Sequence, residues 1–205
     1  MNFLENGNRN APTRIVLAHG AGAHMDSPFM NYFAEELGSE EIHVIRFEFP
    51  YMAQRRLDGS KRPPDRQPKL LACWQEVIAQ FGPAENVIIG GKSMGGRMAS
   101  LIADPVGVKG LLCLGYPFYA AGKSDKPRIE HLLDIKTPTL IVQGERDAMG
   151  NHETVLNYSL SSKIDFYWCP DGDHSFKPRK ASGRNEVENW QDAIAAIRVF
   201  LADKC

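Results

Sequence analysis

The amino-acid sequence predicts a single α/β domain over residues 1–205, built as three layers, α/β/α, around a mainly parallel sheet of about six strands. Three observations predict this fold class. The length suits one hydrophobic core. Short apolar runs recur along the chain, and most are continuous, which is typical of strands buried on both faces of a parallel sheet. Segments with helical periodicity separate these runs, so strand and helix alternate.

Runs rich in Val, Ile, Leu and Phe predict the strands, at residues 14–19, 43–49, 86–90, 109–115, 139–144 and 163–169. Helical patterns predict helices within residues 26–37, 69–81, 94–103 and 185–204. Asp26 or Ser27 can cap the first helix, and Pro28 fits its first turn. Gly82 and Pro83 stop the second helix. Residues 50–68 lack periodicity and carry prolines and basic side chains, so we expect an exposed loop there.

Composition excludes several classes of partner. The formal net charge is -1, with 24 basic and 25 acidic residues, which gives no electrostatic footprint for nucleic acid or an anionic membrane. No apolar run approaches the roughly 18 residues of a membrane span, and the first residues lack the pattern of a secretory signal, so we expect a cytoplasmic protein. The four cysteines form no metal-like grouping with histidine, and we expect neither a metal nor a cofactor.

The segment GGKSMGGR, residues 90–97, fits two motifs. Gly91, Lys92 and Ser93 could end a phosphate-binding loop, GxxxxGK[ST], but that motif requires a glycine where Asn86 stands. The residues between Asn86 and Gly91 are mostly strand formers, which leaves no loop to surround a phosphate. Gly91, Ser93 and Gly95 also spell GxSxG, the turn between a buried strand and a helix that exposes a nucleophilic serine. We therefore predict Ser93 as a nucleophile.

A serine hydrolase also needs an acid and a histidine, which follow the nucleophile in that order after later strands. Asp147 follows the fifth predicted strand, and His174 follows the sixth. Each could be an ordinary turn residue, but their joint occurrence in the required order favours a Ser-His-Asp triad. Glu145 competes with Asp147 for the acid, and we prefer Asp147 because it lies deeper in the loop.

Acyl transfer also needs backbone N–H donors for the oxygen that becomes negative. One predicted donor is the backbone N–H of Met94, directly after the nucleophile. The other is the backbone N–H of Ala21, in the glycine-rich HGAGA segment after the first strand. We expect His19 to hold this segment by a hydrogen bond, and His24 lies near enough to contact a substrate.

With HGAGA, GGKSMGGR, GERD and DGDHSF in order, the chain resembles the α/β-hydrolase superfamily over nearly its whole length. In detail it is similar to the small cap-less hydrolases related to dienelactone hydrolases. The resemblance implies a minimal fold without a lid, with the strand ending at His19 beside the strand leading to Ser93. It also implies Ser93 as nucleophile, His174 as general base and Asp147 as its orienting acid.

The chain departs from these relatives in several places. Only about a dozen residues precede the first predicted strand, so the usual amino-terminal hairpin is missing and we expect six strands. No helical lid fits between the fourth and fifth strands, so we expect an open, shallow pocket. Many dienelactone hydrolases use cysteine where this chain has Ser93. Lys92 is unusual before a nucleophile, and we expect it to point to solvent or to the pocket rim.

The resulting hypothesis is a serine hydrolase that acts on a small-molecule carboxylic ester or thioester. Arg55 and Arg56 lie on the active-site side after the second strand, so an anionic substrate group is one expectation and a solvated loop the other. The alternative function is a non-catalytic protein-interaction scaffold, because a fold by itself defines no activity. Scaffolds usually lose triad members, and this chain keeps all of them, which favours an enzyme. The oligomeric state is left open.

Overall fold

The protein, described over residues 1–205 by a computed structural model, is built on one sheet in the order β1-β3-β2-β4-β5-β6-β7. Every neighbouring pair is parallel except β1 and β3. The strands are β1 (Phe3–Asn6), β2 (Thr13–Ala18), β3 (Ile42–Phe47), β4 (Val87–Lys92), β5 (Gly110–Leu114), β6 (Thr139–Gly144) and β7 (Ile164–Cys169). The predicted α/β class with a mainly parallel sheet is confirmed.

The expectation of six strands is wrong, because β1 adds a seventh at the edge of the sheet. It pairs antiparallel with β3, with Phe3 opposite Phe47 and Asn6 opposite Val44. All four of its residues are half-buried. A strand this short has too few residues to show a period, and its hydrogen-bond partner lies far along the chain, so the local sequence gives little sign of it.

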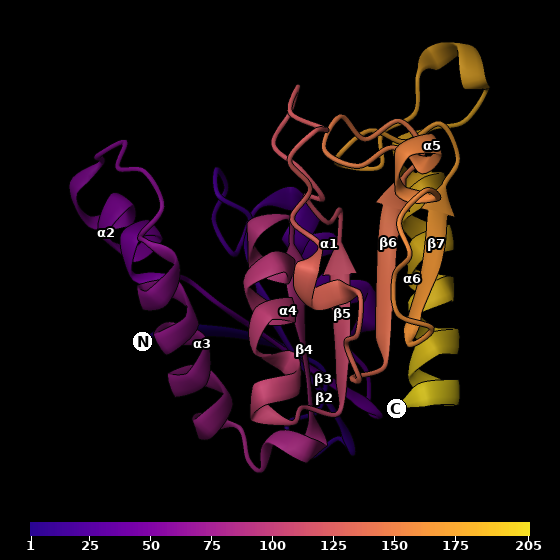
Figure 1. The fold of residues 1–205 in the computed structure, drawn as a ribbon. Coiled ribbons are helices and arrows are strands. Elements are labelled where there is room, and N and C mark those ends of the chain that lie inside the picture. Colours follow the sequence, from indigo (N-terminus) through magenta and orange to yellow (C-terminus); the bar gives the residue numbers. More distant parts are fainter.

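Helices cover both faces of the sheet (Figure 1). The helices α1 and α6 pack on one face, and α2, α3 and α4 pack on the other. The helices are α1 (Pro28–Leu37), α2 (Pro50–Asp58), α3 (Gln67–Gln80), α4 (Met94–Val106), α5 (His152–Val155) and α6 (Glu186–Lys204), with 3-10 turns at Ala84–Asn86, Glu130–Leu132 and Lys180–Ser182. This arrangement is the predicted three-layer architecture.

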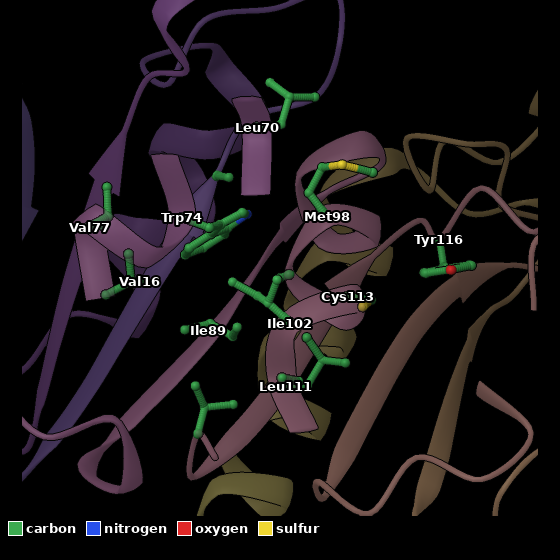
Figure 2. Close-up of a cluster of buried hydrophobic side chains, with 14 of the residues drawn as sticks. Val16, Leu70, Trp74, Val77, Ile89, Met98, Ile102, Leu111, Cys113 and Tyr116 are labelled. Atoms are coloured by element: carbon green, nitrogen blue, oxygen red, sulfur yellow. The ribbon is translucent and has the colours of Figure 1, made fainter. Parts of the chain in front are cut away.

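Alternation along the strands divides the hydrophobic core into two clusters. In β2, Ile15 and Leu17 face α1 and α6, whereas Val16 and Ala18 face α3 and α4. Figure 2 shows side chains of α3 and α4 meeting those of β2, β4 and β5 in the second of these clusters. Trp74 of α3 is fully buried there. Its ring meets that of Phe47 edge to face, with centroids 4.7 Å apart.

The expected exposed loop at residues 50–68 is wrong over its first half, where α2 forms. Pro50 occupies the first turn, and Gly59 ends the helix in the left-handed conformation at φ 67°. Tyr51 and Met52 are buried in its first turn, and Arg55 and Arg56 follow one turn later, where they are half-buried and exposed respectively. Only two buried residues anchor the helix, so the sequence shows almost no apolar period there.

The order of the strands places a break in the topology at β2. This strand lies between β3 and β4, so the chain passes to one side of β2 and then returns to the other. Ala18 is in register with Gly91, which confirms that the strand ending at His19 lies beside the strand leading to Ser93. In open parallel sheets, the crevice at the carboxyl ends of such strands is the usual place for a ligand site.

Candidate active site

Ser93 stands on the sharp turn between β4 and α4. Its backbone has φ 52° and ψ -116°, a region that a residue with a side chain rarely adopts. The turn is possible because the residues two before and two after Ser93 are glycines. A Cβ on Gly91 would come 2.1 Å from the Ala18 carbonyl oxygen, and a Cβ on Gly95 would come 2.4 Å from the same atom. The close approach of β2, β4 and α4 therefore requires these two glycines.

His174 joins the hydroxyl of Ser93 to the carboxylate of Asp147. The imidazole Nε2 lies 2.8 Å from Ser93 Oγ, and Nδ1 lies 2.7 Å from Asp147 Oδ2. An ionised carboxylate only accepts hydrogen bonds, so this pairing places the imidazole proton on Nδ1 and leaves Nε2 free to accept the serine proton. Loops that follow β4, β6 and β7 bring these three side chains together from distant parts of the sequence.

Asp147 is fully buried and accepts hydrogen bonds on both oxygens. Oδ2 also accepts from Gln143 Nε2 at 2.9 Å, and Oδ1 accepts from the Met149 backbone N–H at 2.8 Å. The competing carboxylate, Glu145, instead accepts from the backbone N–H of Asp171 at 2.7 Å and is exposed. Of the two acids, Asp147 is the one that contacts His174.

The loop that carries His174 is fixed by side chains from other elements. Its backbone is strained at Asp171 and Phe176, which have positive φ values of 52° and 70°. The carbonyl oxygen of Asp171 accepts from Arg146 Nε at 2.9 Å. Further along, Trp190 Nε1 donates to the Ser175 carbonyl at 3.0 Å and Asn189 Nδ2 to the Phe176 carbonyl at 2.7 Å. These bonds hold a conformation that the loop alone would not keep.

The glycine-rich segment after β2 is oriented by His19, which is fully buried. The Phe49 N–H donates to His19 Nε2 at 3.1 Å, so Nδ1 carries the proton and donates to the Gly20 carbonyl at 2.6 Å. Burial lowers the pKa of His19 to about 4, so the ring is neutral near pH 7. The expectation that His19 holds this segment by a hydrogen bond is confirmed.

This hydrogen bond also sets the direction of the Ala21 N–H. In a trans peptide the carbonyl and the following N–H point in opposite directions, so turning the Gly20 carbonyl toward His19 turns the Ala21 N–H away from it. The Ala21 N–H makes no hydrogen bond within the protein. The Ala21 carbonyl in turn accepts from the Tyr51 hydroxyl at 3.0 Å. On the other side, Met94 is the first residue of α4, so its N–H has no partner within the helix.

A cavity of about 390 Å³ opens beside Ser93, and Ala21, Phe29, Met149 and His174 are among the residues that line it. The short 3-10 turn Glu130–Leu132 is the one helical element between β5 and β6, where a helical lid would be inserted. The prediction of a lid-free fold is confirmed. A larger cavity of about 590 Å³ lies elsewhere, between β1 and α2, and contains none of the predicted triad residues.

The three predicted substrate-binding residues lie outside the cavity at Ser93. His24 Nδ1 lies 3.3 Å from the carboxylate of Glu48, which is almost fully buried. Arg56 pairs with Glu48 and Asp26 and lines the larger cavity. Arg55 lies closer to the candidate site, because its guanidinium is 3.4 Å from the Ala21 carbonyl oxygen.

Lys92 does not point to solvent, and that expectation is wrong. Its side chain is partly buried, and its Nζ donates to the backbone carbonyl of His174. It also lines the cavity beside Ser93. The sequence offered one sign of this placement, since Lys92 belongs to an apolar strand that is covered on both faces. Gln143 was missed in the same way, as a polar side chain near the carboxyl end of the buried strand TLIVQG.

A family model described as Alpha/beta hydrolase domain matches residues 11–202, and the chain belongs to this family. The resemblance to the α/β-hydrolase superfamily is thereby confirmed, whereas the relation to dienelactone hydrolases stays a prediction. Membership supports a hydrolase as the class of protein. No group of three or more His, Cys, Asp or Glu side chains is placed to hold a metal ion, and no helix has the length and apolar character to cross a membrane.

Three solved structures illustrate the likeness in fold. A lid-less a/b serine hydrolase from Xanthomonas campestris, XC6422, is 18% identical with a TM-score of 0.65, covering 98% of this chain and 87% of that one. Est1E from Butyrivibrio proteoclasticus is 15% identical with a TM-score of 0.69, covering 98% and 94%. An alpha-beta serine hydrolase homologue from Coxiella burnetii is 19% identical with a TM-score of 0.62, covering 84% and 82%. At these identities the likeness concerns the fold.

Proposed function

We propose that this protein is a serine hydrolase that cleaves carboxylic esters or thioesters through an acyl-enzyme intermediate. The observation that carries the proposal is the continuous hydrogen-bonded chain from Ser93 Oγ through His174 to Asp147. Nucleophile, base and orienting acid stand in the order and contact that this chemistry needs. Membership of the hydrolase family supports the same class of reaction.

In the first step His174 Nε2 takes the proton of Ser93 Oγ while the oxygen attacks the acyl carbonyl carbon. The imidazolium then gives that proton to the leaving alcohol or thiol as its bond to the acyl group breaks. In the second step water attacks the acyl-enzyme, His174 takes a proton from the water, and the carboxylic acid leaves as Ser93 regains its proton. Asp147 stays ionised and stabilises the imidazolium in both steps.

The N–H groups of Ala21 and Met94 are the proposed donors to the oxyanion of each tetrahedral intermediate. The Ala21 N–H has no other hydrogen-bond partner in the protein, and the Met94 N–H has none within its helix, which supports both assignments. The amino terminus of α4 adds a partial positive charge at the same point. Loss of one such donor typically costs about 2.7 to 4 kcal/mol of transition-state stabilisation.

The dimensions of the cavity favour short or flat acyl groups. Its volume of about 390 Å³ is at the low end of the range for small-molecule sites, roughly 300 to 1,000 Å³. Phe29 and Met149 give it apolar walls. One of the similar structures is Est1E with ferulic acid bound, so a feruloyl ester belongs in the substrate panel beside short p-nitrophenyl esters and acyl thioesters.

Arg55 is the residue we propose for contact with an anionic substrate group. Its guanidinium lies against the ring of Tyr51 at 5.1 Å, and it makes no ion pair with a carboxylate. Arg56 is a poorer candidate because Glu48 and Asp26 already neutralise its charge. Arg55→Gln should therefore raise the KM of a substrate that carries a carboxylate near the ester more than the KM of a matched neutral ester.

A fluorophosphonate probe tests the proposed function directly. We expect the probe to label the wild type at a single site and to fail with Ser93→Ala. The variant should keep its circular-dichroism spectrum, because Ser93 is half-buried and its side chain hydrogen-bonds only to His174. A folded wild type that resists the probe and hydrolyses none of the panel would refute the proposal and favour a non-catalytic scaffold.

A further inference from the structure

Lys92 connects the nucleophile strand to the backbone of the histidine loop. It is the last residue of β4 and directly precedes Ser93. Its Nζ donates to the carbonyl oxygen of His174 at 2.5 Å. The same nitrogen lies 5.3 Å from the ring centre of Phe29 and 5.7 Å from that of Phe176. The ammonium group of Lys92 therefore contacts both the backbone of the histidine loop and the rings of Phe29 and Phe176.

No carboxylate lies within 4.0 Å of this cation, so it forms no ion pair. The groups that favour its charge electrostatically are Asp147 after β6, Asp173 on the histidine loop and the Cys169 thiol at the end of β7. Helix α1 contributes only the ring of Phe29. Burial lowers the pKa of Lys92 to about 8, so placing the charge here opposes folding. An apolar side chain would fill the same space at less cost.

The structure leaves space for this contact at Gly115, which follows β5. This glycine has φ 69°, and a Cβ on it would lie 2.7 Å from Lys92 Nζ and 2.8 Å from the His174 carbonyl oxygen. Any side chain at this position would push the ammonium and the carbonyl apart. The absence of a side chain at Gly115 therefore leaves room for the hydrogen bond from Lys92 Nζ to the His174 carbonyl.

The other anchors of the histidine loop come from elsewhere in the fold. Arg146 lies in the loop after β6, and Asn189 and Trp190 lie on α6. Lys92 is the anchor that comes from the strand carrying the nucleophile. Its length and position fix the backbone of His174 relative to Ser93, whereas the other three fix the loop relative to the rest of the protein.

From these contacts we propose that Lys92 is a positioning residue for the reaction: its ammonium holds the His174 backbone so that the imidazole stays between Ser93 and Asp147. This inference rests on the proposed hydrolase function. A displacement of about 1 Å at a reacting group can cost about 100-fold in rate. The role predicts a loss in kcat, because the substrate cavity itself keeps its apolar walls.

The test compares Lys92→Met with Lys177→Met in the full chain. Lys177 lies on the same loop, is exposed, and its side chain makes no hydrogen bond or ion pair, so it controls for loss of one positive charge. With a short neutral p-nitrophenyl ester we expect kcat of Lys92→Met to fall about 100-fold and KM to change less than about threefold. Lys177→Met should match the wild type. Wild-type kcat in Lys92→Met would overturn the inference.

A second pair of variants disrupts the same contact without removing the lysine. Gly115→Ala places a methyl group between Nζ and the carbonyl, whereas Gly122→Ala has φ 74° and nothing within 4 Å of the new Cβ. Alanine is strained at the positive φ of both positions, but only Gly115→Ala disrupts the contact with Lys92. Only Gly115→Ala should therefore lower kcat by more than the strain itself does. If both variants lose kcat equally, the contact is not responsible.

The dependence of kcat on pH separates the role of the ammonium charge from a simple loss of packing, because lost packing would not change the shape of this dependence. Because the pKa of Lys92 is lowered to about 8, the wild-type kcat should decline as the pH rises through that value. Lys92→Met should lack this decline and show a low kcat throughout. An alkaline decline that persists unchanged in Lys92→Met would count against the ammonium as its cause.

Failure of the proposed function would be recognised separately. A folded wild type that the fluorophosphonate probe does not label and that hydrolyses none of the panel refutes the hydrolase, and the positioning role is then tested by proton NMR of His174. The proton between Nδ1 and Asp147 Oδ2, a 2.7 Å contact, should give a low-field signal in the wild type that is lost or shifted in Lys92→Met. An identical signal in both proteins would overturn the inference without reference to turnover.

Discussion

Replacing Asp147 by asparagine tests the proposed acid most sharply, because all three groups around this carboxylate are donors. Oδ2 accepts from His174 Nδ1 and Gln143 Nε2, at 2.7 and 2.9 Å, and Oδ1 accepts from the Met149 N–H at 2.8 Å. An amide has one accepting oxygen and one donating NH₂ group. In either orientation the NH₂ group therefore faces at least one donor inside a site closed to water.

The two orientations have different consequences for His174. With the amide oxygen at the Oδ2 position, the tautomer is kept and the NH₂ group opposes the Met149 N–H. In the reverse orientation NH₂ opposes Gln143, which cannot turn over because its own oxygen accepts from the Tyr116 N–H at 2.7 Å. His174 would then accept at Nδ1 and carry its proton on Nε2, facing Ser93, where it could not act as a base.

The expected cost follows from these contacts. A buried donor left without an acceptor costs about 1 to 3 kcal/mol, so the free energy of unfolding in urea should fall by about that amount. Loss of the charge alone, or of the tautomer as well, should lower kcat/KM for p-nitrophenyl acetate by about 10² to 10⁴-fold. The rate of fluorophosphonate labelling should fall in parallel.

Glu145→Gln is the matched control, since it removes the neighbouring carboxylate that bonds to Asp171 rather than to His174. We expect it to keep kcat/KM within about twofold of the wild type. Full activity in Asp147→Asn combined with a large loss in Glu145→Gln would reassign the acid to Glu145. Full activity in both would refute a carboxylate-dependent mechanism.

Three further predictions concern the surroundings of the site. Tyr51→Phe removes the donor to the Ala21 carbonyl and should lower kcat/KM about tenfold, the worth of one hydrogen bond, with little change in stability by urea unfolding. Lys92→Met should gain stability over the wild type below pH 8, because the unfolded chain binds the lysine proton more tightly. As the pH rises from about 8 to 10.5 that advantage should shrink by up to about 3 kcal/mol in chemical denaturation. Gly91→Ala, whose Cβ would meet the Ala18 carbonyl at 2.1 Å from a φ of 149°, should lose at least about 3 kcal/mol of stability or fail to accumulate as folded protein.

The parts of the fold that the sequence predicts are those that depend on continuous local patterns. Strands β2 to β6 are buried on both faces or nearly so, β7 at the edge is half-buried, and the apolar runs of all six stand out between turns. The placement of Ser93, Asp147 and His174 follows from one rule, that the carboxyl ends of parallel strands share an edge of the sheet. The contacts among them agree with that expectation, and their catalytic roles stay predictions.

The elements that escaped prediction depend on contacts made far along the chain. Strand β1 exists because β3 offers it an edge, and its four residues alone show no period. Helix α2 is held by Tyr51 and Met52, too few residues to reveal an amphipathic face among so many charges. Lys92 looks like a surface residue by type, and its partly buried cation is stabilised by the His174 carbonyl and by the aromatic rings of α1 and the histidine loop.

The anchoring of the histidine loop by α6 has a consequence for biosynthesis. During translation β4 and its nucleophile turn leave the ribosome long before Asn189 and Trp190, whose side chains hold the carbonyls of Phe176 and Ser175. Until α6 is made, His174 sits on a strained loop without two of its anchors. The nascent protein therefore carries its serine without a positioned general base, and reactivity towards esters should appear only as the final helix docks.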